Sequence, residues 1–114
     1  MPLVFVSRSE NIGDTLIGAI AEALPEIVAK HLGEPNHLVF ALTPNDVEVR
    51  VQDSPFNVLN SDLEVVILAL KSDERIRTGL LRTEAIALDL KAKLPDNITG
   101  FVWATLVEGF FTPL

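Results

Sequence analysis

The stretch Leu63-Glu64-Val65-Val66-Ile67-Leu68-Ala69-Leu70 is almost continuously apolar and rich in β-branched residues. Such a run is typical of an interior strand that is covered on both faces. Side chains alternate between the two faces of a strand, so Leu63, Val65, Ile67 and Ala69 share one face, and Glu64, Val66, Leu68 and Leu70 share the other. Both faces are mostly apolar, which places this strand at the centre of a sheet.

Helical and strand patterns continue on both sides of this run. After it, Ile76, Leu80, Thr83, Ala87, Leu90 and Leu94 form one helical stripe, so we expect a helix over 73–94 that ends before Pro95. A closing strand is predicted over 101–107. Before it, Val47, Val49 and Val51 alternate with polar residues, which predicts a strand with Arg50 on its polar face.

The first third of the chain repeats this order. Residues 3–6 predict a short buried strand, and helical spacing from residue 11 to residue 32 predicts a helix. Ser9 or Asn11 is the expected cap, and Pro25 predicts a kink or a restart because it removes a backbone donor. Residues 38–42 fit either a short strand or a turn of helix.

The strand and helix predicted over 3–32 therefore occur in the same order as the strand and helix predicted over 63–94. We predict a single α+β domain over 1–114 with a pseudo-repeat of 2–53 and 62–108. Right-handed crossovers would give a four-stranded sheet with two helices on one face. The other face would be bare and apolar, which predicts an oligomer that covers it.

Composition excludes several functional classes. The chain has no cysteine, which removes thiol catalysis and disulfides, and its net charge of -7 disfavours binding to nucleic acid or to an acidic membrane. No apolar run approaches the ~18 residues of a membrane span, and residues 1–6 are too short for a signal-peptide core. We expect a cytoplasmic protein without a metal or cofactor site.

Pro2 and the arginines Arg8, Arg50 and Arg75 are the candidates for chemistry. If Met1 is removed, Pro2 becomes a secondary amine on a buried strand, and burial would bring its pKa toward the range of a general base. Taken alone, the Met1-Pro2 dipeptide favours the plainer interpretation, in which Pro2 is an ordinary start to a strand. Arg50 could clamp a carboxylate or form a cross-strand ion pair, and Arg8 and Arg75 could be clamps or ordinary surface charges.

The combination of these features resembles the tautomerase superfamily, in particular the 5-carboxymethyl-2-hydroxymuconate isomerases and macrophage migration inhibitory factor. Met1-Pro2 before a short strand, residues 6–12 after it, and Val49-Arg50-Val51 carry the resemblance, together with the start of the second helix. It covers essentially the whole chain.

The resemblance implies a mixed four-stranded sheet, a homotrimer and a cofactor-independent tautomerase acting on a small unsaturated 2-hydroxy or 2-oxo carboxylic acid. Pro2 would be the base. Arg50 would hold the substrate carboxylate, with Arg75, or Arg77 in its place, as a second clamp. Trp103 and Thr105 would line the pocket where inhibitory-factor-like members place tyrosine and asparagine. The chain has no tyrosine, which argues against dopachrome or phenylpyruvate tautomerase activity of that type.

Two other interpretations remain open at this point. A non-catalytic trimer of the same fold could bind a small acid or a protein, and retention of Met1 would favour it because Pro2 would then be an amide. A ferredoxin-like ligand-binding domain could instead dimerise through its open sheet face.

Overall fold

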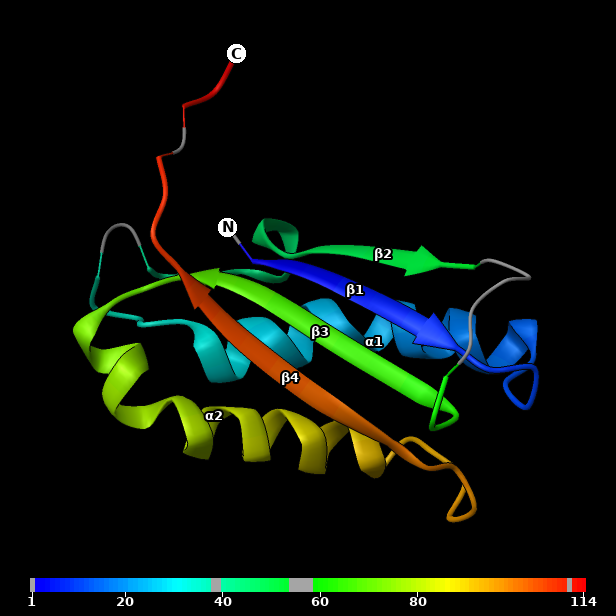
Figure 1. Cartoon of the computed structure of the whole chain (residues 1–114). Helices are drawn as coiled ribbons and strands as arrows, with labels where there is room; N and C mark the ends of the chain where they lie inside the picture. The colour runs from blue at the N-terminus through cyan, green and yellow to red at the C-terminus, as the bar shows by residue number, and fades with distance from the viewer. Residues whose placement is uncertain (1, 38–39, 54–58, 111) are drawn as a thin grey trace.

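A computed structural model describes residues 2–37, 40–53, 59–110 and 112–114. The order strand-helix-strand occurs twice along the chain, as the sequence predicts (Figure 1). The elements are β1 (Leu3–Arg8), α1 (Asp14–Leu32), a 3-10 helix η1 (Pro44–Asp46), β2 (Glu48–Gln52), β3 (Leu63–Leu70), α2 (Asp73–Lys91) and β4 (Gly100–Val107).

The four strands form one mixed sheet in the order β2-β1-β3-β4. Within each repeat the two strands are parallel: β1 pairs with β2, and β3 pairs with β4. The two repeats meet through the antiparallel pairing of β1 with β3, in which Leu3 lies opposite Leu68 and Val6 opposite Val65. The predicted four-stranded mixed sheet is therefore confirmed.

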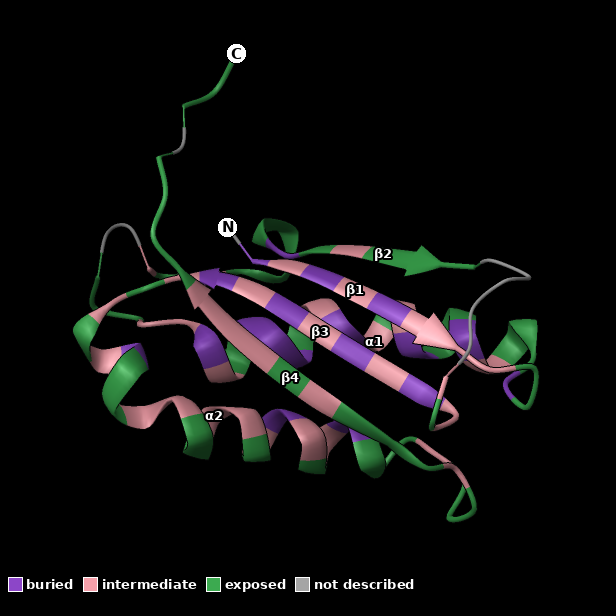
Figure 2. Ribbon diagram, in the orientation of Figure 1, coloured by how far each residue is buried: buried purple, intermediate pink, exposed green. Residues whose placement is uncertain are grey.

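Both helices cover the same face of the sheet (Figure 1). On β3 the burial alternates, because the side chains that face the helices are buried and those on the other face are half-buried (Figure 2). The interior strand that the sequence predicts to be covered on both faces is thus covered on one face within a single chain. The open face carries the large apolar side chains Leu3, Phe5, Val66, Leu68, Leu70, Phe101, Trp103 and Val107.

The start of α1 differs from the prediction. The helix begins at Asp14 with Gly13 as its N-cap, so neither Ser9 nor Asn11 caps it. Both side chains instead donate to the Asp62 carboxylate, from Ser9 Oγ at 3.2 Å and from Asn11 Nδ2 at 2.8 Å. These bonds, with a further one from the backbone of Thr99, hold the pKa of Asp62 below its usual range.

Of the two alternatives expected at Pro25, a kink or a restart, the restart does not occur, because α1 is continuous from Asp14 to Leu32. Leu24 and Val28 next to this proline are fully buried. Their packing against the sheet compensates for the single backbone hydrogen bond that proline removes.

The second helix is shorter than predicted. Ser72 Oγ accepts a hydrogen bond from Arg75 N at 3.1 Å and fixes the start of α2, and the helix ends at Lys91 rather than at residue 94. Lys93 N and Leu94 N donate to carbonyls three residues back, which tightens the chain into a turn before Pro95.

Between α1 and β2, within the first repeat, the described residues include the 3-10 helix η1, with a capping box between Thr43 and Asp46. The predicted strand or helical turn over 38–42 falls partly on residues 38 and 39, which lie outside the described residues. None of the helices in the described part of the chain combines the length and apolarity that a bilayer crossing requires.

We predict that Ile67→Ala lowers the free energy of unfolding by about 2–5 kcal/mol, because Ile67 is fully buried at the centre of β3. Urea unfolding at a fixed protein concentration measures the change. Leu88→Ala is the matched control, since Leu88 is 70% exposed on α2 and its truncation should change stability by less than about 0.5 kcal/mol. Equal losses in the two variants would contradict the burial pattern.

Candidate active site

Pro2 lies immediately before β1 and is fully buried. Its carbonyl accepts a hydrogen bond from Glu48 N at 3.1 Å, which extends the pairing of β1 with β2. Because Leu3 lies opposite Leu68, the antiparallel register places Pro2 level with Ala69 on β3. Alternation along the strand puts the Pro2 ring on the helix-covered side, together with Val4.

A cavity of about 860 Å³ opens at this end of the sheet, where β3 and β4 finish and α2 begins. We call it the strand-end cavity; its lining residues are Phe40, Leu70, Lys71, Ser72, Asp73, Val107, Glu108, Gly109 and Phe110. Pro2 is not part of the lining, but Leu70 follows Ala69, the residue level with Pro2. The cavity and the candidate base therefore lie at the same end of the sheet.

Arg75 lies behind the cavity wall and is only 2% exposed. Its Nε and Nη2 donate to the carbonyl of Leu32 at 3.2 and 3.0 Å, and its Nη1 donates to the carbonyl of Leu70 at 2.8 Å. The guanidinium also stacks over the Phe40 ring, 4.7 Å from its centroid. Burial lowers the pKa of Arg75, and the Glu34 carboxylate partly offsets this. The Arg75 side chain therefore links the end of α1 to the end of β3 through these hydrogen bonds.

Arg77, the alternative to Arg75, lies on the exposed surface of α2 and pairs with Glu74. Its guanidinium is turned to solvent rather than toward the strand-end cavity, of which it is not a lining residue.

Arg8 lies at the opposite end of β1 from Pro2. Its guanidinium donates two hydrogen bonds to the Asp53 carboxylate at 3.0 and 2.8 Å and forms an ion pair with Asp14 at 2.8 Å. These acids raise the pKa of Arg8, and Arg8 in turn lowers the pKa of Asp53. Arg8 thus ties the end of β2 to the start of α1.

Arg50 and Trp103 share one row across the open face of the sheet. The register runs from Arg50 on β2 to Phe5, Val66 and then Trp103 on β4. Strand spacing puts the two ends of this row roughly 14 Å apart. Arg50 is exposed and pairs with Glu48 at 3.1 Å. Within one chain, therefore, Arg50 and Trp103 do not converge.

Thr105 lies one row further along the open face, level with Leu68 and Leu3. Pro2 is on the opposite, helix-covered face. A site that used Pro2, Arg50, Trp103 and Thr105 together would need side chains from more than one copy of the chain.

None of the predicted site residues lines the strand-end cavity, and the residues that sequence reasoning missed there include Phe40, Lys71 and Glu108. The sequence position of Lys71 could have marked it as a site residue, because it follows an apolar strand and precedes a capped helix and so lies at the end of the sheet. No sequence feature marked Phe40 or Glu108, because only the fold brings residues so far apart in the sequence to one place.

Comparison with known proteins gives matches among solved structures alone. No family model matches the sequence, and no curated protein matches it. The macrophage migration inhibitory factor-like protein of Entamoeba histolytica superposes with a TM-score of 0.59 at 12% identity, over 95% of this chain and 88% of that one. A fused 4-OT described as a symmetric trimer gives a TM-score of 0.58 at 15% identity, over 92% and 85%.

A third match is the malonate semialdehyde decarboxylase FG41, with a TM-score of 0.57 at 17% identity over 92% of this chain and 82% of that one. These three proteins are members of the tautomerase superfamily. The chain has the tautomerase fold. At these identities the similarity is one of backbone architecture.

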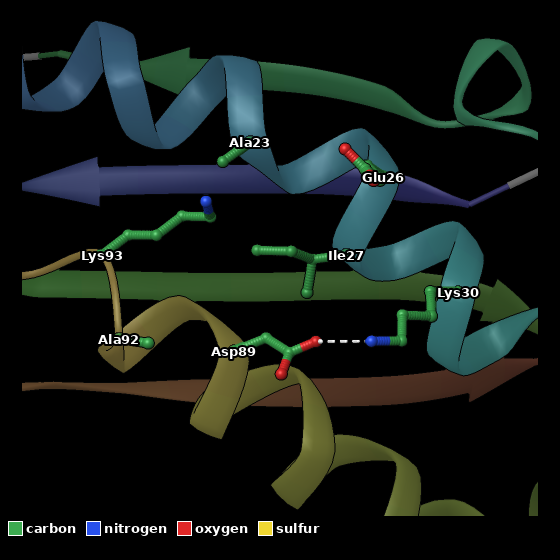
Figure 3. Close-up of a pocket in the computed structure, with 7 residues that line it drawn as sticks. All are labelled: Ala23, Glu26, Ile27, Lys30, Asp89, Ala92 and Lys93. Carbon is green, nitrogen blue, oxygen red and sulfur yellow. Dashed lines mark ion pairs between the residues drawn. The ribbon is translucent and has the colours of Figure 1, made fainter.

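A second hollow, of about 410 Å³, lies between the helices on the outer side of this tautomerase fold (Figure 3). Asp89 on α2 joins the two helices there, through His31 Nε2 at 2.6 Å and Lys30 Nζ at 3.7 Å. No predicted site residue lines this hollow; its lining is Ala23, Glu26, Ile27, Lys30, Asp89, Ala92 and Lys93. Among the described residues, no cluster of three or more acidic or histidine side chains is suited to a metal ion.

We predict that Arg75→Lys lowers the free energy of unfolding by about 1–3 kcal/mol, because one ammonium cannot reproduce the fork that reaches both Leu32 and Leu70. Arg77→Lys is the matched control and should change stability by less than about 0.5 kcal/mol. Thermal or urea unfolding measures both, and equal stability of the two variants would show that the Arg75 bonds are not stabilising.

We also predict that Asp89→Asn destabilises the protein at neutral pH. The His31 hydrogen bond and the Lys30 charge hold the pKa of Asp89 below its usual range. A depressed carboxyl pKa contributes stability above the unfolded-state value, and this contribution is lost as pH falls through the folded-state value. The stability difference between wild type and variant, measured by urea unfolding, should shrink in the acid range; a constant difference would contradict the pairing.

Proposed function

We propose that this chain is a cofactor-independent tautomerase or isomerase that moves a proton within a small unsaturated 2-hydroxy or 2-oxo carboxylic acid. The observation that carries the proposal is the position of Pro2, which is buried before β1 at the same end of the sheet as the strand-end cavity. The fold supports it, because structures of a fused 4-OT and a malonate semialdehyde decarboxylase are similar to this chain.

Removal of Met1 would convert the Pro2 nitrogen from an amide into a secondary amine. Low dielectric around a buried amine disfavours its protonated form and brings its pKa toward neutral pH, where a general base is most efficient. The amine takes a proton from one position of the dienol or ketone and returns it to another carbon. The reaction is proton-neutral overall and needs no cofactor.

A trimer would complete the site. The open sheet face leaves Trp103 63% exposed and Phe101 46% exposed, which is a large apolar surface for a single copy. In a closed ring of copies, the β2 edge of one chain would meet the β4 edge of the next. Arg50 of one copy and Trp103 and Thr105 of another would then line one pocket.

Arg50 is the proposed carboxylate-orienting arginine. Its present partner is the exposed Glu48, so its guanidinium is available to a ligand. The proposed contributions of Arg8 and Arg75 are indirect, because their donors already hold Asp53 and backbone carbonyls in place.

A second candidate function depends on the fate of Met1. A protein that keeps Met1 has an amide at Pro2 and no basic nitrogen there. Such a protein would be a non-catalytic trimer that binds a small acid or a protein partner.

We predict that cell-derived protein begins at Pro2 by intact mass and accelerates ketonisation of 2-hydroxydienoates. Pro2→Ala should lower kcat by about 100-fold or more, as expected for loss of a general base. Pro95→Ala, in an exposed turn, is the matched control and should be as active as wild type.

Light scattering gives an independent measurement, with an expected mass of three times the 12.5 kDa chain. A processed protein that is inactive across a broad panel of 2-hydroxydienoates, or a Pro2→Ala variant with full activity, would exclude the enzyme. Retained Met1 in an inactive trimer would support the non-catalytic binding protein. A dimer would support the ferredoxin-like ligand-binding domain.

A further inference from the structure

The outward side of α2 is unusually apolar for a surface helix. Leu80, Leu81 and Leu88 are 73%, 69% and 70% exposed, and Ile76 is half exposed. Figure 2 shows exposed segments recurring along α2. The exposed residues of α1, by contrast, are all polar or small: Asp14, Thr15, Gly18, Ala19, Glu22, Glu26 and Lys30. Large exposed apolar side chains that cluster on one helix mark an interaction surface.

The exposed residues of α2 share one side of the helix. We call them the α2 outer face; in chain order they are Asp73, Ile76, Arg77, Leu80, Leu81, Glu84, Leu88 and Lys91. At 3.6 residues per turn they span an arc of about 140°. The buried residues Arg75, Ile86 and Leu90 lie on the opposite side, which packs on the core. The α2 outer face is therefore a different surface from the open face of the sheet.

The charges of the α2 outer face follow an order that is complementary to its own reversal. Acidic Asp73 and basic Arg77 come first along the helix, and acidic Glu84 and basic Lys91 follow. A second copy of α2 lying antiparallel would bring Lys91 beside Asp73 and Glu84 beside Arg77. The midpoints of these two pairs differ by about 1.5 residues, or roughly 2 Å along the helix, so one register satisfies both. A parallel copy would instead place each charge beside its like.

The apolar residues of the α2 outer face fit the same register. Leu80 and Leu81 lie at the midpoint of the charged pairs, so each would meet its own copy. Ile76 and Leu88 lie on either side of them along the helix. An isologous contact uses the same patch on both partners and requires this self-complementarity, whereas a contact with a different protein does not.

The charged groups of the α2 outer face are available for a contact. Arg77 pairs with Glu74, and the two side chains are 71% and 45% exposed. Ion pairs this exposed are weak and exchange readily. Within the described part of the chain, Asp73, Glu84 and Lys91 form no ion pair.

We propose that two copies of this chain associate through their α2 outer faces, with the helices antiparallel and Leu81 beside the twofold axis. The contact is separate from the sheet-face contact of the proposed trimer, and it does not depend on the proposed catalytic function. One pair of helices buries less than the roughly 800 Å² per partner of a standard interface. The association is therefore weak and develops as the protein concentration is raised.

Single cysteines test the register, because the chain has no cysteine of its own. Leu81→Cys should cross-link two chains under mild oxidation, since beside the twofold axis its Cα atoms come within the about 4.4–6.8 Å that a disulfide spans. Leu88→Cys is the matched control: it is equally exposed, but its two copies would lie about 20 Å apart, so it should cross-link at least about tenfold more slowly. Equal rates, or faster cross-linking of Leu88→Cys, would overturn the antiparallel register.

Charge reversal tests the complementarity. In sedimentation measurements over a concentration series, Arg77→Glu and Glu84→Arg should each weaken the association about tenfold, because each sets like charges across the contact. The double variant should return to within about twofold of wild type. A double variant that is as weak as the single variants, with an unfolding midpoint like that of wild type, would exclude the charge pairing.

The mass at low concentration separates this contact from the proposed trimer. Leu81→Glu should abolish the concentration-dependent step and leave the mass at the lowest concentration unchanged, because Leu81 is not on the open face of the sheet. A fall in that mass would assign the α2 outer face to the trimer contact and overturn the inference. If wild type shows no concentration-dependent step up to about 1 mM, the contact is wrong even where the trimer and Pro2-dependent turnover are observed.

Discussion

Both helices lie on the same face of the sheet because each β-α-β crossover of a twisted sheet is right-handed. The antiparallel pairing of β1 with β3 then joins the repeats so that their helices pack side by side. One face of the sheet is sealed, and the other keeps a row of large apolar side chains in contact with water. This asymmetry sets the location of the core, the need for a partner surface and the position of the strand ends.

The arginines in this chain have different structural roles, which depend on where the fold places them. Arg75 is enclosed and satisfies the carbonyls at the end of α1 and β3, so it behaves as part of the scaffold. Arg8 performs a similar task at the far end of β1, through acidic side chains. Arg50 differs, because it stands on the open face with an exposed partner. A guanidinium that looks like a ligand clamp in sequence can thus be fully occupied in the fold.

The end of the sheet near Pro2 combines several chain segments. The start of β1, the residue after β3 and the residue after β4 meet there, with Phe40 contributed by the segment after α1. This convergence follows from topology, since two parallel pairs run in opposite directions and bring the amino end of β1 to the carboxyl end of β3. Charges at such a junction come from residues far apart in the sequence, and Lys71 with Glu108 is an example.

The sequence by itself determined the order of strands and helices, because hydrophobic periodicity is a local property that side-chain alternation and helical spacing express directly. The common face of the two helices followed from the right-handed rule for β-α-β crossovers. The sequence also marked Pro2 and Arg50 as candidates. It did not determine that α1 begins at Asp14, after Gly13, or that α1 stays continuous through Pro25, where burial of Leu24 and Val28 outweighs local preference. Nor did it show that Arg8 and Arg75 are fully engaged whereas Arg50 has only an exposed partner, or that Lys71 pairs with Glu108. Those features depend on contacts between residues distant in the chain, and only the tertiary structure decided them.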